Sequence, residues 1–185
     1  MPNDFILEIK GVQRYRDREP DTIELTTEAE LTGEDGVLSL RYAESELTGL
    51  QGTDTVFELH RDKVILRRSG AVSSEMVFQT GQVHQSLYNM EEGALLVTIR
   101  TTAVEDEMTL TGGSLHVSYD ITIESLGMGT IDYWLKVRPK KMKNCGVGQI
   151  AIWPKKEKSA IRKILHFQLS IFNFQLFLTS RRPAA

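Results

Sequence analysis

Apolar and polar residues alternate along residues 4–138, with frequent Thr, Val, Ile and Tyr, and helical spacing is almost absent. A period of two is typical of strands that bury one face. The pattern predicts candidate strands at 4–16, 21–32, 36–47, 53–60, 63–69, 74–80, 83–89, 94–102, 104–111, 114–125 and 129–138.

Short turns separate these candidate strands, among them "GEDG" at 33–36, "TGQ" at 80–82 and "GMG" at 127–129. Glycine adopts positive φ at no steric cost, so such segments suit hairpins. Strands joined by hairpins lie side by side and antiparallel, and closure of the sheet removes its two unpaired edges. The sequence therefore predicts an all-β fold, a single antiparallel up-and-down β-barrel of about 8–10 strands.

The alternation also predicts which side chains point into the barrel. The expected inward face consists of Phe5, Leu7, Ile9, Ile23, Leu25, Leu38, Leu40, Phe57, Leu59, Val64, Leu66, Met76, Phe78, Leu95, Val97, Ile99, Leu115, Val117, Tyr119, Ile121 and Ile123.

One stretch of the sequence carries a family resemblance. The pattern "RxGxxxxxMxFxxG", here Arg68, Gly70, Met76, Phe78 and Gly81, is followed by a Tyr and a Gly at 88 and 93. With the surrounding residues 4–138, it resembles the YwiB family of bacterial domains of unknown function. The resemblance implies a calycin-like barrel, related in shape to lipocalins, and it implies no activity.

Length and composition favour one domain at 1–138 with an appendage at 139–185. The single cysteine, Cys145, cannot form an intramolecular disulfide, which fits a reducing compartment. The start of the sequence has no secretory signal pattern, so we expect a cytoplasmic protein.

Charge divides the chain at the same point. Residues 139–185 hold ten of the 22 basic residues and one of the 25 acidic residues, so the body carries about −12 and the tail about +9. An acidic body repels phosphates, so we expect no nucleic-acid binding by residues 1–138. Membrane contact is expected only through the tail, if at all.

The tail has a different composition from the body. Its stretch 164–178, "ILHFQLSIFNFQLFL", is apolar and aromatic but too short for a bilayer-spanning helix. Three interpretations remain open: an extraneous product of a frameshift or read-through, a helix lying on the barrel or on a membrane, and a nucleic-acid arm.

Two adjacent arginines end the apolar run at 64–66. Arg68 shares a strand face with Val64 and Leu66, so we expect it to point inward. A buried guanidinium needs a carboxylate or a ligand anion. Two interpretations remain open, a bridge to Glu46 or Glu58 and a ligand clamp; the calycin-like resemblance implies an interior Arg and Tyr that hold a ligand carboxylate.

The candidate ligand-binding residues are Arg68, Met76, Phe78, Tyr88 and Tyr119. The four histidines, at 60, 84, 116 and 166, lack metal-ligand spacing, so no metal site is expected. No nucleophile motif or phosphate loop is present, so we expect neither an enzyme nor a cofactor.

The predicted function is a barrel that binds a small apolar or amphipathic molecule. The alternative is a protein-interaction or regulatory module whose barrel is packed solid. Lumen volume distinguishes the two. The sequence leaves the oligomeric state open.

Overall fold

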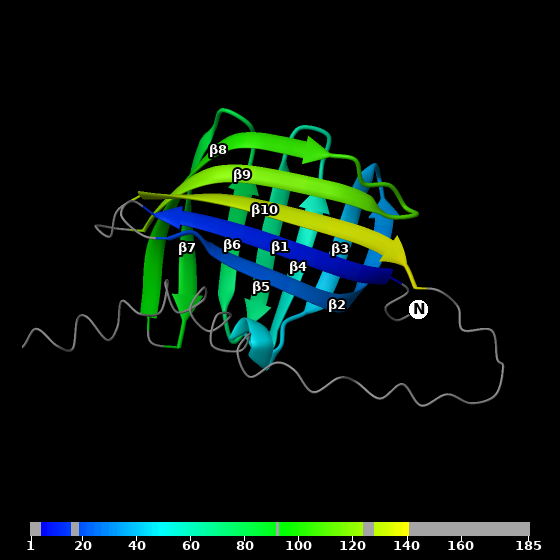
Figure 1. Cartoon of the computed structure of the whole chain (residues 1–185), viewed down its shortest axis with the longest axis horizontal. Coiled ribbons are helices and arrows are strands. Elements are labelled where there is room, and N and C mark those ends of the chain that lie inside the picture. Colours follow the sequence, from blue (N-terminus) through cyan, green and yellow to red (C-terminus); the bar gives the residue numbers. More distant parts are fainter. Residues whose placement is uncertain (1–4, 16–18, 92, 124–127, 141–185) are drawn as a thin grey trace, which may run out of the picture.

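A computed structural model describes residues 5–15, 19–91, 93–123 and 128–140. Ten strands form a closed barrel in the order β1-β10-β9-β8-β7-β6-β5-β4-β3-β2, so each strand lies beside its neighbours in sequence (Figure 1). The strands are β1 (Phe5–Tyr15), β2 (Asp21–Glu34), β3 (Val37–Ala43), β4 (Thr53–Leu59), β5 (Val64–Gly70), β6 (Ser73–Phe78), β7 (Val83–Met90), β8 (Gly93–Asp106), β9 (Gly113–Ile123) and β10 (Met128–Pro139).

The first and last strands close the barrel. β1 pairs antiparallel with β10 along its whole length, from Phe5 opposite Pro139 to Tyr15 opposite Gly129. All other neighbouring pairs are antiparallel as well. The predicted all-β, up-and-down antiparallel barrel is therefore confirmed, and it has ten strands.

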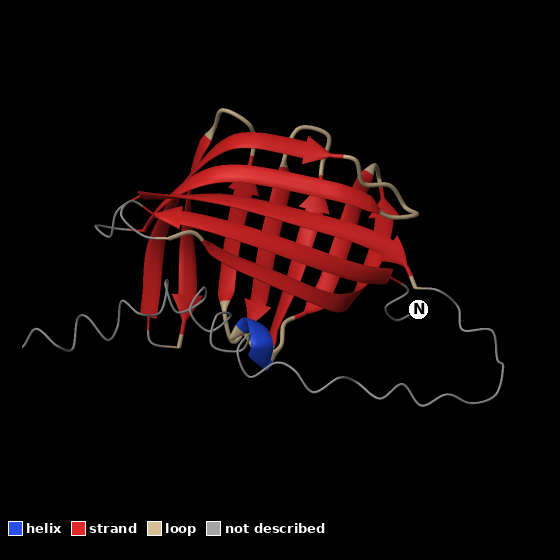
Figure 2. Ribbon diagram, viewed as in Figure 1, coloured by secondary structure: helices blue, strands red, loops and turns tan. Residues whose placement is uncertain are grey.

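Three predicted strands were wrong in their bounds. The candidate at 94–102 and the first residues of the candidate at 104–111 form one strand, β8, which ends at Asp106. A bulge between Thr101 and Ala103 shifts its pairing with β9. Such a bulge keeps the strand continuous while it bends. The candidate at 36–47 ends at Ala43, because a 3-10 turn, η1 (Glu46–Thr48), follows it (Figure 2).

One face of each strand fills the interior. β4 shows this clearly, since every second residue from Thr53 to Leu59 is buried. Phe57, Leu7 and Ile99 are almost completely inaccessible to solvent. The predicted inward residues are buried or pack against this core, except that Ile23 is half-buried without being part of it.

The described part of the chain contains no helix that is long and apolar enough to span a membrane. β10 ends at Pro139, one residue beyond the predicted body, and Lys140 pairs with Glu28 at 2.5 Å. The rest of the predicted tail, 141–185, lies outside the described residues, and so do its three interpretations.

Candidate functional site: a cavity inside the barrel

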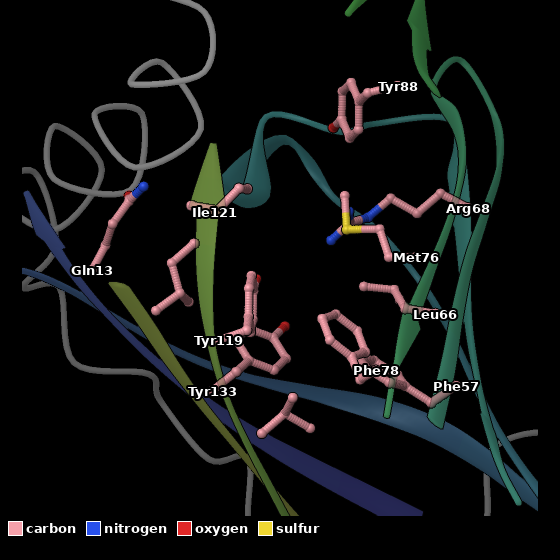
Figure 3. A pocket seen from close by; sticks show the side chains of 12 residues that line it. Gln13, Phe57, Leu66, Arg68, Met76, Phe78, Tyr88, Tyr119, Ile121 and Tyr133 are labelled. Carbon is pink, nitrogen blue, oxygen red and sulfur yellow. The ribbon is translucent and has the colours of Figure 1, made fainter. Parts of the chain in front are cut away.

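A cavity of about 70 Å³, measured as the space open to the centres of water molecules, lies inside the barrel and is partly open to solvent. At roughly 10–15 Å³ per water on this measure, it has room for several water molecules. Figure 3 shows the side chains around it. The lining residues are Gln13, Phe57, Leu66, Arg68, Met76, Phe78, Tyr88, Val117, Tyr119, Ile121, Ile131 and Tyr133.

Strand alternation places the two arginines of β5 on opposite faces. Arg68 lies opposite Thr55 of β4 and Ser74 of β6, and its side chain lines the cavity (Figure 3). Arg67 lies on the outside, where its guanidinium pairs with Glu58 and Glu75. The prediction that Arg68 points inward agrees with this placement.

A buried carboxyl group lies beside Arg68. The distance from Arg68 Nε to Glu44 Oε1 is 3.9 Å, and the Glu44 side chain is 3% exposed. Glu44 Oε1 accepts hydrogen bonds from Thr55 Oγ1 at 2.6 Å and Tyr42 Oη at 3.0 Å. Arg68 Nε is itself buried and has no hydrogen-bond partner within the described ranges.

The predicted structural partners of Arg68, Glu46 and Glu58, are therefore wrong. Glu58 pairs with Arg67 on the outer face, and Glu46 is exposed in η1. Glu44 continues the inward face of β3 beyond the end of the strand, two residues after Tyr42. The same alternation in the sequence could have identified it.

Burial keeps the tyrosines around the cavity neutral. It raises the pKa of Tyr88 and Tyr119, and it raises the pKa of Tyr133 to about 12. Burial lowers the pKa of the Arg68 guanidinium, but Tyr88, Tyr42 and Glu44 raise it by more, so its net pKa lies above the ordinary value. The site thus combines a permanent cation with phenol hydroxyls that can donate hydrogen bonds.

The cavity brings together all five candidate residues from the sequence, which are Arg68, Met76, Phe78, Tyr88 and Tyr119. The Phe78 and Tyr119 rings are in contact, with centroids 4.9 Å apart.

Sequence reasoning missed two polar residues of the cavity lining. Gln13 is 2% exposed and donates a hydrogen bond to Tyr15 Oη, and Tyr133 hydrogen-bonds with Tyr42. Gln13 shares the face of Leu7 and Ile9 in β1, so its position could have been predicted from the alternation.

Metal ligands do not cluster in the described part of the chain: no group of three or more His, Cys, Asp or Glu side chains there could hold an ion. Of the four histidines, His166 lies outside the described residues. Of the other three, His60 lies in a turn and His84 and His116 lie on β7 and β9.

A family model described as "Domain of unknown function (DUF1934)" matches residues 7–137. The chain belongs to this family. A similar solved structure is the "Crystal structure of ywiB protein from Bacillus subtilis", with a TM-score of 0.67 and 22% sequence identity. The match covers 75% of this chain and 92% of that one, and it shows a shared fold. The predicted resemblance is confirmed. The curated proteins contain no match to this sequence.

Proposed function

We propose that the barrel binds a small amphipathic molecule whose anionic group contacts Arg68. The observation that carries this proposal is the position of Arg68 Nε, which is buried without a hydrogen-bond partner on a side chain that lines the cavity. A buried N–H donor left unpaired costs about 1–3 kcal/mol, which an anionic ligand would recover.

The neighbouring carboxyl group leaves the guanidinium free to bind a ligand. A guanidinium has five N–H donors. Glu44 lies 3.9 Å from Nε, beyond hydrogen-bond distance, and its Oε1 already accepts from Thr55 and Tyr42. A ligand anion in the cavity can therefore accept hydrogen bonds from Arg68 and from the neutral phenol of Tyr88.

The rest of the cavity suits a short apolar body. Its walls include Phe57, Leu66, Met76 and Phe78, and it has no Ser, Cys, Lys, His or carboxyl side chain among its lining residues. This set supports binding rather than catalysis. The cavity of about 70 Å³ is smaller than a usual drug-sized pocket, so we expect a short-chain or single-ring ligand.

The alternative function, a solid-packed interaction module, has less support because the interior contains this cavity. The two functions differ in one observable. Native mass spectrometry of protein purified gently from its own cells should show a retained small molecule if the barrel is a binding protein.

The binding mode is tested with hexanoate and its neutral analogue hexanamide, titrated by calorimetry. The test variant is Arg68→Met combined with Glu44→Gln, which removes both buried charges, and the control is Arg67→Met on the outer face. We expect hexanoate to bind wild type and the control, and to bind the double variant about tenfold to a hundredfold more weakly, the scale of a charge-assisted hydrogen bond. Hexanamide should bind wild type, the control variant and the double variant with equal affinity. Equal hexanoate affinity in wild type and the double variant, or no binding to wild type, would contradict the proposal.

A further inference from the structure

β6 and β7 are consecutive strands that barely pair. Along their fully described lengths they pair at two positions, Ser73 opposite Asn89 and Ser74 opposite Tyr88. β5 and β6 pair at five positions. Residues 75–78 of β6 and 83–87 of β7, between these two pairs and the connecting turn, are here called the seam.

The turn between the two strands explains the seam. Residues 79–82 close a tight turn, in which Gln82 N donates to Gln79 O at 2.9 Å, and the same residues bond to β8. Gly81 N donates to Thr101 O at 2.9 Å, and Thr101 N donates to Gln82 O at 3.1 Å. Within the seam, the side chain of Ser86 donates from Oγ to the carbonyl of Glu75. A side-chain hydrogen bond thus stands where a backbone ladder would otherwise run.

The cavity reaches the inner side of the seam. Met76 and Phe78 line it from β6, and Tyr88 lines it from β7 (Figure 3). Beside these residues, Ser74 Oγ and His84 Nε2 are buried and have no hydrogen-bond partner in the part of the chain that the structure describes. Buried polar atoms of this kind are normally satisfied by water, so this part of the interior is suited to hydration.

The outer side next to the seam carries three exposed apolar side chains beside the polar Gln85 and Glu75. Val83 and Leu87 of β7 are 48% and 56% exposed, and Leu96 of β8, opposite Leu87, is 40% exposed. Large apolar side chains gathered on an exposed surface commonly mark a binding or encounter site. An amphipathic molecule that binds this surface would lie beside β6 and β7, the neighbouring strands with the fewest paired positions.

We propose that small molecules enter and leave the cavity through the seam. Separation of most other neighbouring strands breaks several backbone hydrogen bonds, whereas the seam is joined by the Ser86 side chain. The route rests on the proposed ligand-binding function for its biological meaning. Its physical basis, access to the cavity, can be tested without any ligand.

The test labels a cysteine placed in the cavity. In a Cys145→Ser background, Met76→Cys provides the reporter, and alkylation by iodoacetamide is followed by mass spectrometry. A short bis-maleimide first links Val77→Cys to Gln85→Cys, which the register of Ser74 and Tyr88 places opposite each other across the seam. The matched control link joins Gln85→Cys to Thr98→Cys, which are partners in the β7–β8 ladder.

We expect the seam link to slow alkylation of the reporter by about tenfold or more, and the control link to change it by less than about twofold, because only the former blocks opening. A second variant acts in the opposite direction: Ser86→Ala removes the side-chain bridge and should speed alkylation several-fold without any link. Equal alkylation rates with the two links, or an unchanged rate in Ser86→Ala, would overturn the route.

A ligand experiment separates this inference from the proposed function. Exchange of a trifluoromethyl-terminated hexanoate, followed by fluorine NMR, should show slower association and slower dissociation in the seam-linked protein at an unchanged Kd. Slowed alkylation with no hexanoate binding in any form would support the route and contradict the proposed ligand. Hexanoate binding together with equal alkylation rates for the two links would support the proposed ligand and contradict the route.

Discussion

Arg67 and Arg68 are neighbours in the sequence and differ in almost every physical respect. The Arg67 side chain is 45% exposed on the outer face and pairs with Glu58 and Glu75. The Arg68 side chain is 14% exposed, lines the cavity and lies 3.9 Å from a Glu44 side chain that is 3% exposed. Both residues carry the same charge.

The difference follows from the period of the strand. Successive side chains point to opposite faces, so one residue separates a solvated ion pair from a buried one. Water screens the outer pair, and its net contribution is small. The inner pair has lost most of its hydration, so removal of one partner leaves a costly charge.

The largest effect is expected for Arg68→Met. The substitution leaves the buried Glu44 carboxyl without its cation, and such a loss typically costs about 3–5 kcal/mol. Urea denaturation at neutral pH should show this fall in the free energy of unfolding. The double variant with Glu44→Gln should recover most of it, since no uncompensated charge remains. A loss below about 1 kcal/mol in Arg68→Met would show that the buried pair is not coupled.

The second largest loss of stability is expected at alkaline pH, where the buried tyrosines on the inner face of the barrel lose their protons. Burial raises the pKa of Tyr133 to about 12, whereas an unfolded tyrosine titrates near 10. Because the unfolded chain releases its proton first, stability is fully present below about pH 10 and falls as the pH rises toward about 12. At about 1.4 kcal/mol per pH unit, the Tyr133 part of this loss is about 3 kcal/mol.

Urea denaturation at a series of alkaline pH values measures this loss, and Tyr133→Phe should reduce its slope. The pKa values of Tyr88 and Tyr119 are raised by burial as well, so part of the slope should remain in that variant. Stability that stays constant up to about pH 12 would be inconsistent with neutral buried phenols.

Gly70 ends β5 two residues after Arg68, and its replacement should have a somewhat smaller effect. Gly70 has a φ of +116°, and a Cβ there would lie 2.1 Å from the carbonyl oxygen of Gly52. Gly70→Ala should therefore destabilise by about 2 kcal/mol or slightly more, through strain and a backbone shift.

Gly81→Ala is the matched control for Gly70→Ala. Gly81 also has positive φ, at +78°, but a Cβ there would have no neighbour within 4 Å. Gly81→Ala should lower the free energy of unfolding by about 1 kcal/mol, because only the strain of the backbone conformation remains. Equal losses of the free energy of unfolding in the two variants would mean that the backbone moves away from Gly52 without an energetic cost.

Strand alternation predicted the barrel and much of its site from sequence. It placed Arg68, Tyr88 and Tyr119 inside because side-chain direction in a strand depends only on parity. Strand ends were harder to predict. Residues 104–106 continue β8 past a bulge. The alternation of apolar and polar residues in the sequence reveals neither this bulge nor the turn that follows it.

Alternation could identify Glu44 as an inward residue, but it could not show that Glu44 lies beside Arg68. Glu44 lies after the end of β3, where the chain leaves the regular strand, and its place beside Arg68 depends on pairing between β3, β4 and β5. The seam is equally invisible in sequence. It arises because the 79–82 turn bonds to β8, and a turn motif does not specify which strand its backbone will meet.

The smallest effect is expected for Arg67→Met, which completes the comparison. Arg67 donates to Glu75 at 2.7 Å and also pairs with Glu58, yet its side chain is 45% exposed and water screens both contacts. Loss of the guanidinium should lower the free energy of unfolding by less than about 1 kcal/mol, and the difference from wild type should shrink further at high salt. Urea denaturation in low and high salt measures this directly. A salt-insensitive loss of several kcal/mol, as large as that of Arg68→Met, would show that the outer network is as desolvated as the inner pair, and the contrast between the two faces of β5 would fail.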